Sequence, residues 1–202
     1  MSSTDDTSHS SSSIQGALSF GRTARAKPDR TIEGLEVADE SGVSSDALWS
    51  ALRRFPAGVT VVTATSDEGY QGITVSAFSL VSLTPPRVLV CINEFSQLLD
   101  AIQASGAFAA TILSGRQELL AERFAGRAPR PDSSFSDIAH RTLLTGAPVF
   151  EGGLAWLDCR LQQAYPGGDH TIFVGLVVAA GVAESQDDPL VYFGSQYRRL
   201  AP

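Results

Sequence analysis

Apolar and polar residues alternate along much of the chain in a pattern that predicts short strands separated by turns. Alternating or β-branched apolar runs predict strands over residues 58–65, 70–79, 87–93, 107–113, 154–165, 171–182 and 190–193. Gly, Pro and Asp residues mark turns at 66–69, 84–86 and 166–169. The run at 87–93 is apolar at nearly every position, which is typical of a strand buried on both faces.

Three segments show helical spacing instead. We predict helices over 46–55, which Pro56 ends, over 96–105, which stops at Gly106, and from Ser114 to about residue 125. Ser114 and Gln117 fit a capping box at the start of the third helix. Because strands outnumber helices and short turns join most of them, we predict a mainly β fold, an antiparallel barrel with peripheral helices.

Composition separates the first 45 residues from the rest of the chain. This segment opens with MSSTDDTSHSSSS and contains a single aromatic residue, Phe20. Such a segment buries too little apolar surface to offset the entropy lost on ordering. We therefore predict a flexible N-terminal extension over residues 1–45 and one folded domain over 46–202. A Ser-rich arm that docks on a partner or is phosphorylated is the alternative reading of the extension.

Net charge and cysteine content limit the kinds of partner and the cellular compartment that we expect for this protein. The formal net charge is −7, which gives no general attraction to nucleic acid or to anionic membranes, so we expect neither as a partner. Cys91 and Cys159 are too few for a disulfide framework, and no apolar run approaches the roughly 20 residues that span a bilayer. With no signal peptide evident at the start, we predict a soluble, cytoplasmic protein.

Several common catalytic motifs are missing from the sequence. It contains no G-x-G-x-x-G after a strand, no P-loop and no G-x-S-x-G. His140 and His170 lack Cys or carboxylate residues at ligand spacing, so we expect no metal site. A cysteine–histidine nucleophile pair is disfavoured because both cysteines lie within apolar strand patterns, where small core residues are typical.

Four local features point instead to a ligand-binding site. The chain turns from helix to strand at 54–60, carries alternate hydroxyls over 72–79, ends a buried strand at polar residues over 91–96, and presents His170 in a turn at 168–173. Hydroxyls and backbone N–H groups suit a flat, polar-edged ligand with a phosphate. The start of the helix at Ser96 favours an anion.

Taken together and in this order, these features resemble a known family. Residues from about 46 to 200 resemble the flavin reductase-like, FMN-binding split-barrel family, in particular the small reductase components of two-component flavin-dependent monooxygenases. The motifs that carry the resemblance are RFPAGVTVVTA, GITVSAFSLVSLTPPRVLVCIN, RFAG, LAWLDCRL, GDHTIFVG, PLVYF and YRRL. The resemblance implies an antiparallel split barrel, a homodimer, and an NAD(P)H:flavin oxidoreductase that reduces FMN or FAD with NADH or NADPH for a partner monooxygenase.

The resemblance also implies where the cofactors bind. Residues 56–60 would border the flavin, 74–79 would wrap the isoalloxazine edge and ribityl chain, and 170–173 would face the nicotinamide, with His170 as the catalytic candidate. Asn93 and Ser96 would approach the phosphate end. The implied cofactor-binding residues are Pro56, Ala57, Gly58, Val59, Thr60, Thr74, Val75, Ser76, Ala77, Phe78, Ser79, Asn93, Ser96, His170, Thr171 and Phe173.

One segment departs from the family pattern. Family members often have two hydroxyl residues and then a Thr after the Asn, with a basic residue nearby, whereas this chain has Asn93-Glu94-Phe95-Ser96-Gln97-Leu98. We therefore predict that the flavin is held weakly at its phosphate end and leaves as a reduced product, or that FAD is used. Two alternative functions remain open from the sequence: a non-catalytic flavin- or haem-binding barrel or electron carrier, and an oxidase of the pyridoxamine phosphate type.

Overall fold

The computed structural model describes residues 33, 36, 42–127 and 135–200. By contacts along the chain it divides into two units, Met1–Ser44 and Ser45–Pro202, and the second holds every helix and strand described below. The extension predicted over 1–45 therefore lies almost wholly outside the described residues. In the described part of the chain, no helix has the length and apolar character needed to cross a membrane.

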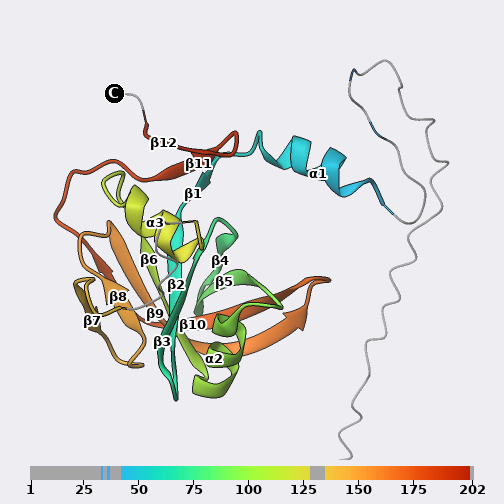
Figure 1. Ribbon diagram of the computed structural model, residues 1–202. Coiled ribbons are helices and arrows are strands. Elements are labelled where there is room, and N and C mark those ends of the chain that lie inside the picture. The colour runs from blue at the N-terminus through green and yellow to red at the C-terminus, as the bar shows by residue number, and fades with distance from the viewer. Residues whose placement is uncertain (1–32, 34–35, 37–41, 128–134, 201–202) are drawn as a thin grey trace, which may run out of the picture. The chain divides into compact units, whose positions relative to one another are not determined.

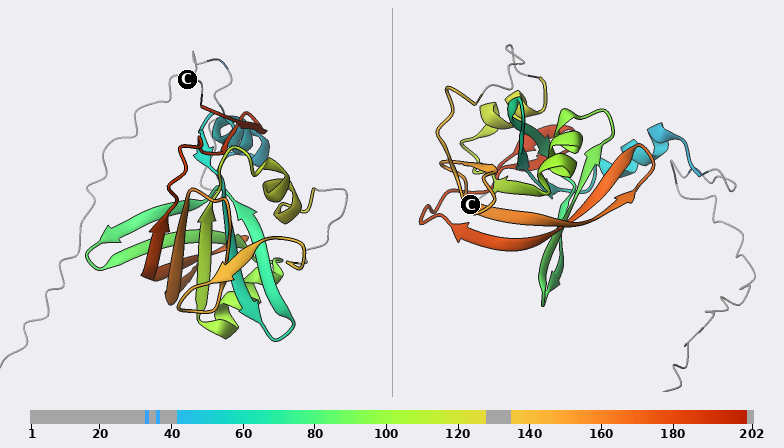
Figure 2. Two further views of the ribbon diagram at one scale, coloured as in Figure 1. Left: turned by 90° about the vertical axis from the view of Figure 1, so that its left-hand side faces the viewer. Right: turned by 90° about the horizontal axis from the view of Figure 1, so that it is seen from below.

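One large antiparallel sheet forms the body of the second unit (Figure 1). Its strands are β2 (Thr60–Ser66), β3 (Gly69–Val75), β4 (Phe78–Leu83), β5 (Pro86–Asn93), β6 (Ala107–Ile112), β9 (Ala155–Pro166) and β10 (His170–Val182). The hydrogen-bonded order is β3-β2-β6-β9-β10-β5-β4, so β3 and β4 stand at the two ends of the order. The views in Figure 2 show the sheet strongly curved. The predicted mainly β, antiparallel split barrel is confirmed.

Smaller elements surround this sheet. A three-stranded sheet contains β1 (Ala57–Gly58), β11 (Val191–Phe193) and β12 (Gln196–Arg198), and a two-stranded sheet contains β7 (His140–Thr142) and β8 (Pro148–Phe150). The helices are α1 (Ser45–Leu52), α2 (Gln97–Ser105) and α3 (Glu118–Phe124). The chain after α1 is tied to the β11–β12 turn, because Gly194 N donates to the carbonyl of Arg53 at 3.0 Å.

The main core lies between the large sheet and α2. Leu98 and Ile102 of α2 pack with the fully buried Val90, Phe108 and Phe173 of the sheet. This buried face accounts for the apolar positions of the predicted helix over 96–105. Burying each large apolar side chain stabilises the fold by about 1.5–3 kcal/mol. The core thus fixes α2 beside the ends of the strands that carry the predicted site.

The predicted single strand over 70–79 is wrong, because the chain breaks at Ser76 and Ala77. β3 pairs with β2 up to Val75, whereas β4 begins at Phe78 and pairs with β5. Since β3 and β4 stand at opposite ends of the sheet order, the chain crosses the split of the barrel at this break. The Ala77 carbonyl accepts a hydrogen bond from Cys91 N at 3.1 Å, which holds the crossing against β5.

The expectation that the strand at 87–93 is buried on both faces is also wrong for this chain alone. Val88, Val90 and Ile92 are buried, whereas Leu89 and Cys91, which alternate with them, remain partly exposed. One face of β5 therefore packs in the core and the other carries apolar side chains that nothing in the described chain fully covers.

Candidate functional site

A cavity of about 210 Å³ opens next to the β3–β4 crossing. Four of the predicted binding residues line it, namely Val59, Thr74, Val75 and Ser76. Five further residues complete the lining: Trp49, Ala125, Arg127, Tyr192 and Tyr197. The cavity thus joins β3 to α1, to the end of α3 and to the β11–β12 hairpin, segments far apart in the sequence. Its wall is mainly apolar and aromatic, with hydroxyls and one guanidinium, as is usual for sites that bind small molecules.

Thr74 and Ser76, the two aliphatic hydroxyl residues of the wall, differ in what their hydroxyls bind. Thr74 Oγ1 donates to the carbonyl of Ala121 in α3 at 2.7 Å, so this hydroxyl ties β3 to the helix. Ser76 is exposed, and its hydroxyl forms no hydrogen bond within the described residues. Ser76, placed where the chain crosses the split, therefore has a hydroxyl left for a ligand.

Arg127 is the cation of this cavity, and two neighbours hold it in place. Its Nε and Nη2 donate to Glu122 Oε1 at 3.1 and 2.9 Å, and Nη2 also donates to the Tyr197 hydroxyl at 3.0 Å. The hydrogen bond from Arg127 lowers the pKa of Glu122. Burial, with the nearby Glu122 carboxylate, raises the pKa of Tyr197 to about 12. At neutral pH the cluster is therefore an ion pair with a neutral phenol.

His170 and Asn93, two further residues predicted at the site, lie together but do not line this cavity. They are paired residues on the adjacent strands β10 and β5, so their side chains leave the same face of the sheet. His170 Nδ1 lies 2.7 Å from Asp169 Oδ1, and the imidazole is less than half exposed. The hydrogen bond from His170 lowers the pKa of Asp169. The carboxylate thereby fixes which ring nitrogen faces outward, leaving Nε2 for a ligand.

The crossing and the His170 pair are linked through β5. Cys91, whose amide holds Ala77, is two residues before Asn93 and pairs with Ile172 of β10. The structure thus sets residues 77–79 beside β5, the strand that ends at Asn93, whereas Thr74 and Val75 pair with β2.

The turn after Asn93 already uses its hydrogen-bonding groups internally. Asn93 Oδ1 accepts from Phe95 N at 2.9 Å, and the Asn93 carbonyl accepts from Ser96 N at 3.0 Å. Ser96 is the N-cap of α2, and its Oγ accepts from Leu98 N at 3.3 Å. The two residues predicted at the phosphate end are therefore engaged in shaping their own turn and helix start.

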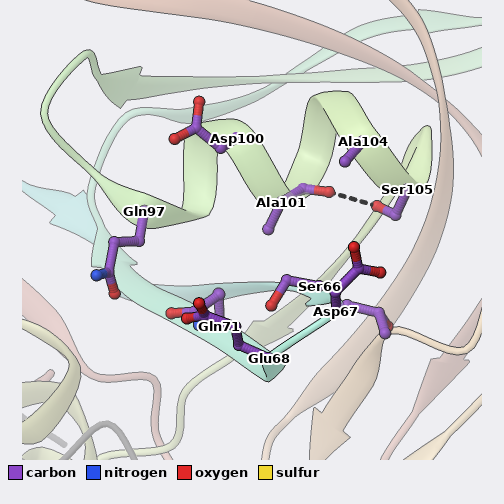
Figure 3. Close-up of a pocket in the computed structure, with 10 residues that line it drawn as sticks. Ser66, Asp67, Glu68, Gln71, Gln97, Asp100, Ala101, Ala104 and Ser105 are labelled. Atoms are coloured by element: carbon purple, nitrogen blue, oxygen red, sulfur yellow. Dashed lines mark hydrogen bonds between the residues drawn. The ribbon is translucent and has the colours of Figure 1, made fainter.

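A larger cavity, of about 520 Å³, lies elsewhere, between the β2–β3 hairpin and α2 (Figure 3). Asp67 and Glu68 of the hairpin and Asp100 of the helix line it, together with Gln71 and Gln97, and no basic residue does. None of the predicted binding residues belongs to it. Because three carboxylates repel an anion, the larger cavity suits a ligand with a phosphate less well than the smaller one does.

Comparison with known proteins shows the family to which this chain belongs. The model of the flavin reductase-like domain matches residues 52–201. The chain belongs to the flavin reductase-like family. It is 42% identical over 155 residues to the reductase component of 4-hydroxyphenylacetate 3-monooxygenase from Thermus thermophilus, a match that covers 77% of this chain and 96% of that protein.

Two further matches agree with this membership. The NADH:FMN oxidoreductase of Rhodococcus qingshengii is 39% identical over 166 residues, which cover 80% of this chain and 85% of that protein. The solved structure of the flavin reductase PheA2 in its native state superposes with a TM-score of 0.73 at 36% identity, covering 79% of this chain and all of that one. These names favour the reductase over the carrier and the oxidase that the sequence left open.

The residues of the smaller cavity fit a flavin chemically. Aromatic and apolar side chains suit a flat ring, the Ser76 hydroxyl suits its polar edge, and the Arg127 guanidinium suits a phosphate. Two of the residues implied by the family resemblance are buried and do not line the cavity. Phe173 is fully buried in the core and Thr60 is 3% exposed.

The other expected positions lie around the site without lining the cavity. Ala57 and Gly58 pair with the β11 strand, Thr171 pairs with the buried Ile92, and Phe78 packs against the main core. Pro56 is exposed, and the Ser79 hydroxyl donates to the neighbouring Leu80 carbonyl at 3.3 Å.

The cavity wall also contains aromatic and charged residues that were not predicted from the sequence, namely Trp49, Arg127, Tyr192 and Tyr197. The last three lie within or next to the motifs RFAG, PLVYF and YRRL, which indicated the family but gave no reason to place them at a ligand. Trp49 is 61% exposed on a helix whose apolar spacing suggested packing instead.

Proposed function

We propose that this chain is an NAD(P)H-dependent flavin reductase that supplies reduced FMN or FAD to a separate flavin-dependent monooxygenase. The observation that carries the proposal is the match to a monooxygenase reductase component over 96% of that protein's length. The folded part of this chain therefore corresponds to the whole of a protein named for this role. The name NADH:FMN oxidoreductase of a second relative supports NADH and FMN as the substrates.

When both nucleotides are bound, they supply the chemistry, a hydride transfer from nicotinamide C4 to flavin N5. The work of the protein is to bind, orient and shield the two rings. Trp49, Tyr192 and Tyr197 offer aromatic surface for a flat ring, and Ser76 offers a hydroxyl to its edge. No side chain has to supply a proton for hydride transfer itself, which is consistent with a cavity wall without a carboxylate or histidine.

His170 is assigned to the nicotinamide side. Asp169 holds Nδ1, so the ring presents Nε2 at the end of the sheet where Asn93 also lies. In this role His170 is a positioning group for the ring that donates the hydride, and Asp169 fixes its orientation.

Weak retention of the flavin follows from the Asn93–Ser96 turn. Its side chains hold their own turn, and Glu94 beside them disfavours a phosphate. A product that must reach another enzyme cannot be bound far more tightly than its working concentration. We therefore propose that flavin is a substrate of this chain and leaves in its reduced form.

We further propose a homodimer. The partly exposed apolar residues Leu89 and Cys91 of β5 offer a face for a second copy. Arg87 Nε, on the same side of this strand, is buried without a hydrogen-bond partner in the described part of the chain. Light scattering is expected to give twice the mass of one chain. The free thiols of Cys91 and Cys159 support a cytoplasmic location.

The direct test of the reductase proposal follows the absorbance of NADH when the purified chain is mixed with free FMN. We expect NADH to be consumed only when flavin is added, with FAD and NADPH as parallel arms that measure preference. A chain that binds flavin but consumes neither NADH nor NADPH would be a carrier, and the proposal would be wrong.

A further inference from the structure

We propose that Arg127 is the anchor for the flavin 5′-phosphate, in place of the turn after Asn93. This inference rests on the proposed function, because it assigns a subsite for the nucleotide that the enzyme would reduce. It concerns which residue distinguishes FMN from a flavin without a phosphate.

A dianionic phosphate is bound by charge-assisted hydrogen bonds from cations or by unengaged backbone N–H groups. At the turn after Asn93, the amides of Phe95, Ser96 and Leu98 all donate within the turn and the helix cap. The amide of Glu94 donates to the Asp169 carbonyl at 3.1 Å. Among the described residues, the turn therefore leaves the Gln97 amide, the Asn93 side-chain NH2 and the Ser96 hydroxyl for a phosphate. It offers no cation, and it adds the negative charge of Glu94.

The cavity beside the β3–β4 crossing offers what the turn lacks. Arg127 lines it together with Thr74 and Ser76, two of the residues predicted to hold the flavin. A guanidinium has five N–H donors. Those on Nε and Nη2 are engaged by Glu122 and Tyr197, whereas Nη1 forms no hydrogen bond within the described residues. The two N–H groups of Nη1 are thus left for an anion.

Glu122 and Tyr197 keep Arg127 in position, and they leave its Nη1 N–H groups able to bind an anion. Glu122 and Tyr197 hold one edge of the planar group, so little side-chain freedom is lost when the other edge binds. The side chain of Arg127 is 51% exposed, so it is accessible from solvent. Glu122 partly neutralises the charge of Arg127, and solvent screens the exposed guanidinium. Both effects keep its affinity for the phosphate moderate, which suits a flavin that must leave.

Arg123 and Arg116 each form an ion pair of their own. Arg123 forms a two-pronged ion pair with Asp137, at 2.9 and 2.7 Å. Arg116 pairs with Asp187 at 2.8 Å on the surface. Neither lines the cavity, and Arg116 therefore provides a matched control with the same type of side chain and an ion pair of its own.

The test uses two flavins that differ only in the phosphate. Binding of FMN and of riboflavin is titrated by flavin fluorescence for the parent chain, Arg127→Gln, Arg127→Lys and the control Arg116→Gln. We expect Arg127→Gln to weaken FMN binding about tenfold, which corresponds to about 1.4 kcal/mol, and to leave riboflavin binding unchanged. Arg127→Lys is expected to retain part of the preference for FMN, and Arg116→Gln all of it.

The outcomes separate this inference from the function on which it rests. Equal weakening of FMN and riboflavin by Arg127→Gln would place Arg127 at the ring and overturn the phosphate assignment. Unchanged FMN binding would overturn it as well, as would a raised KM for NADH with unchanged flavin affinity. If the parent chain binds neither flavin, the proposed function fails together with the inference. Thermal melting of each variant shows that it is folded.

Discussion

Single side chains of the site gain their roles from the neighbours that hold them. His170 is directed by Asp169, Arg127 by Glu122 and Tyr197, and the Thr74 hydroxyl is tied to α3. The sequence indicated His170 because the turn at 168–173 presents a histidine at the start of a strand, and the family resemblance implies that this turn faces the nicotinamide. It did not indicate Arg127, because the residues that orient it lie 5 and 70 positions away along the chain.

His170→Ala is predicted to impair hydride transfer more than flavin binding. The imidazole stands beside Asn93 at the end of the sheet, and a small misplacement of the nicotinamide there costs on the order of 100-fold in turnover. Steady-state rates with NADH and fluorescence titration of FMN measure the two effects separately. Gln162→Ala, an exposed change on β9, is the control. Normal turnover with lost flavin binding would mean that His170 serves the flavin instead.

At the scale of elements, local signals predicted the bounds of α2 but not the start of α3. That helix begins at Glu118, so the prediction that Ser114 and Gln117 open it with a capping box is wrong. Ser96 and Gly106 bound α2 as predicted, because a serine cap and a glycine at φ 65° act within one turn. The break at Ser76 and Ala77 could not be predicted in this way. The strand breaks there because β4 pairs with β5 and not with β2. This long-range pairing leaves the alternation of side chains along 70–79 unchanged, so the sequence pattern does not reveal the break. Strands β7 and β12 are mostly polar and β8 opens with a proline, so none of the three showed an apolar strand pattern.

Gly175→Ala is predicted to destabilise the barrel by about 1–3 kcal/mol, the usual range for overpacking a core. A Cβ at this position of β10 would lie 2.5 Å from the buried ring of Phe108. Thermal denaturation should show a lower melting temperature than for the parent chain. Gly58→Ala is the control, since a Cβ there has no neighbour within 4 Å. An unchanged melting temperature for Gly175→Ala would show that Phe108 moves aside at little cost.

For the whole molecule, the order of motifs along the chain predicted the family and the fold, and the three-dimensional fold supplied the cavity. Val59 and the 74–76 segment were predicted together and do line one cavity. Trp49, Tyr192 and Tyr197 meet there because the β1–β11–β12 sheet brings residues 191–198 back to β1 and to the chain that follows α1. No local pattern encodes that return, so the aromatic wall could not be predicted from the sequence.

The central claim is that reduced flavin is released as a product, and anaerobic ultrafiltration tests it most directly. Equal concentrations of the chain and FMN are treated with excess NADH, the mixture is passed through a membrane that retains the protein, and reduced flavin is measured on both sides. We predict that the filtrate carries reduced FMN at close to its total concentration, because the turn after Asn93 holds its own groups and Arg127 grips only moderately. Reduced flavin that stays above the membrane through repeated washing would contradict the account, and would show a protein that keeps its cofactor and passes electrons to another acceptor.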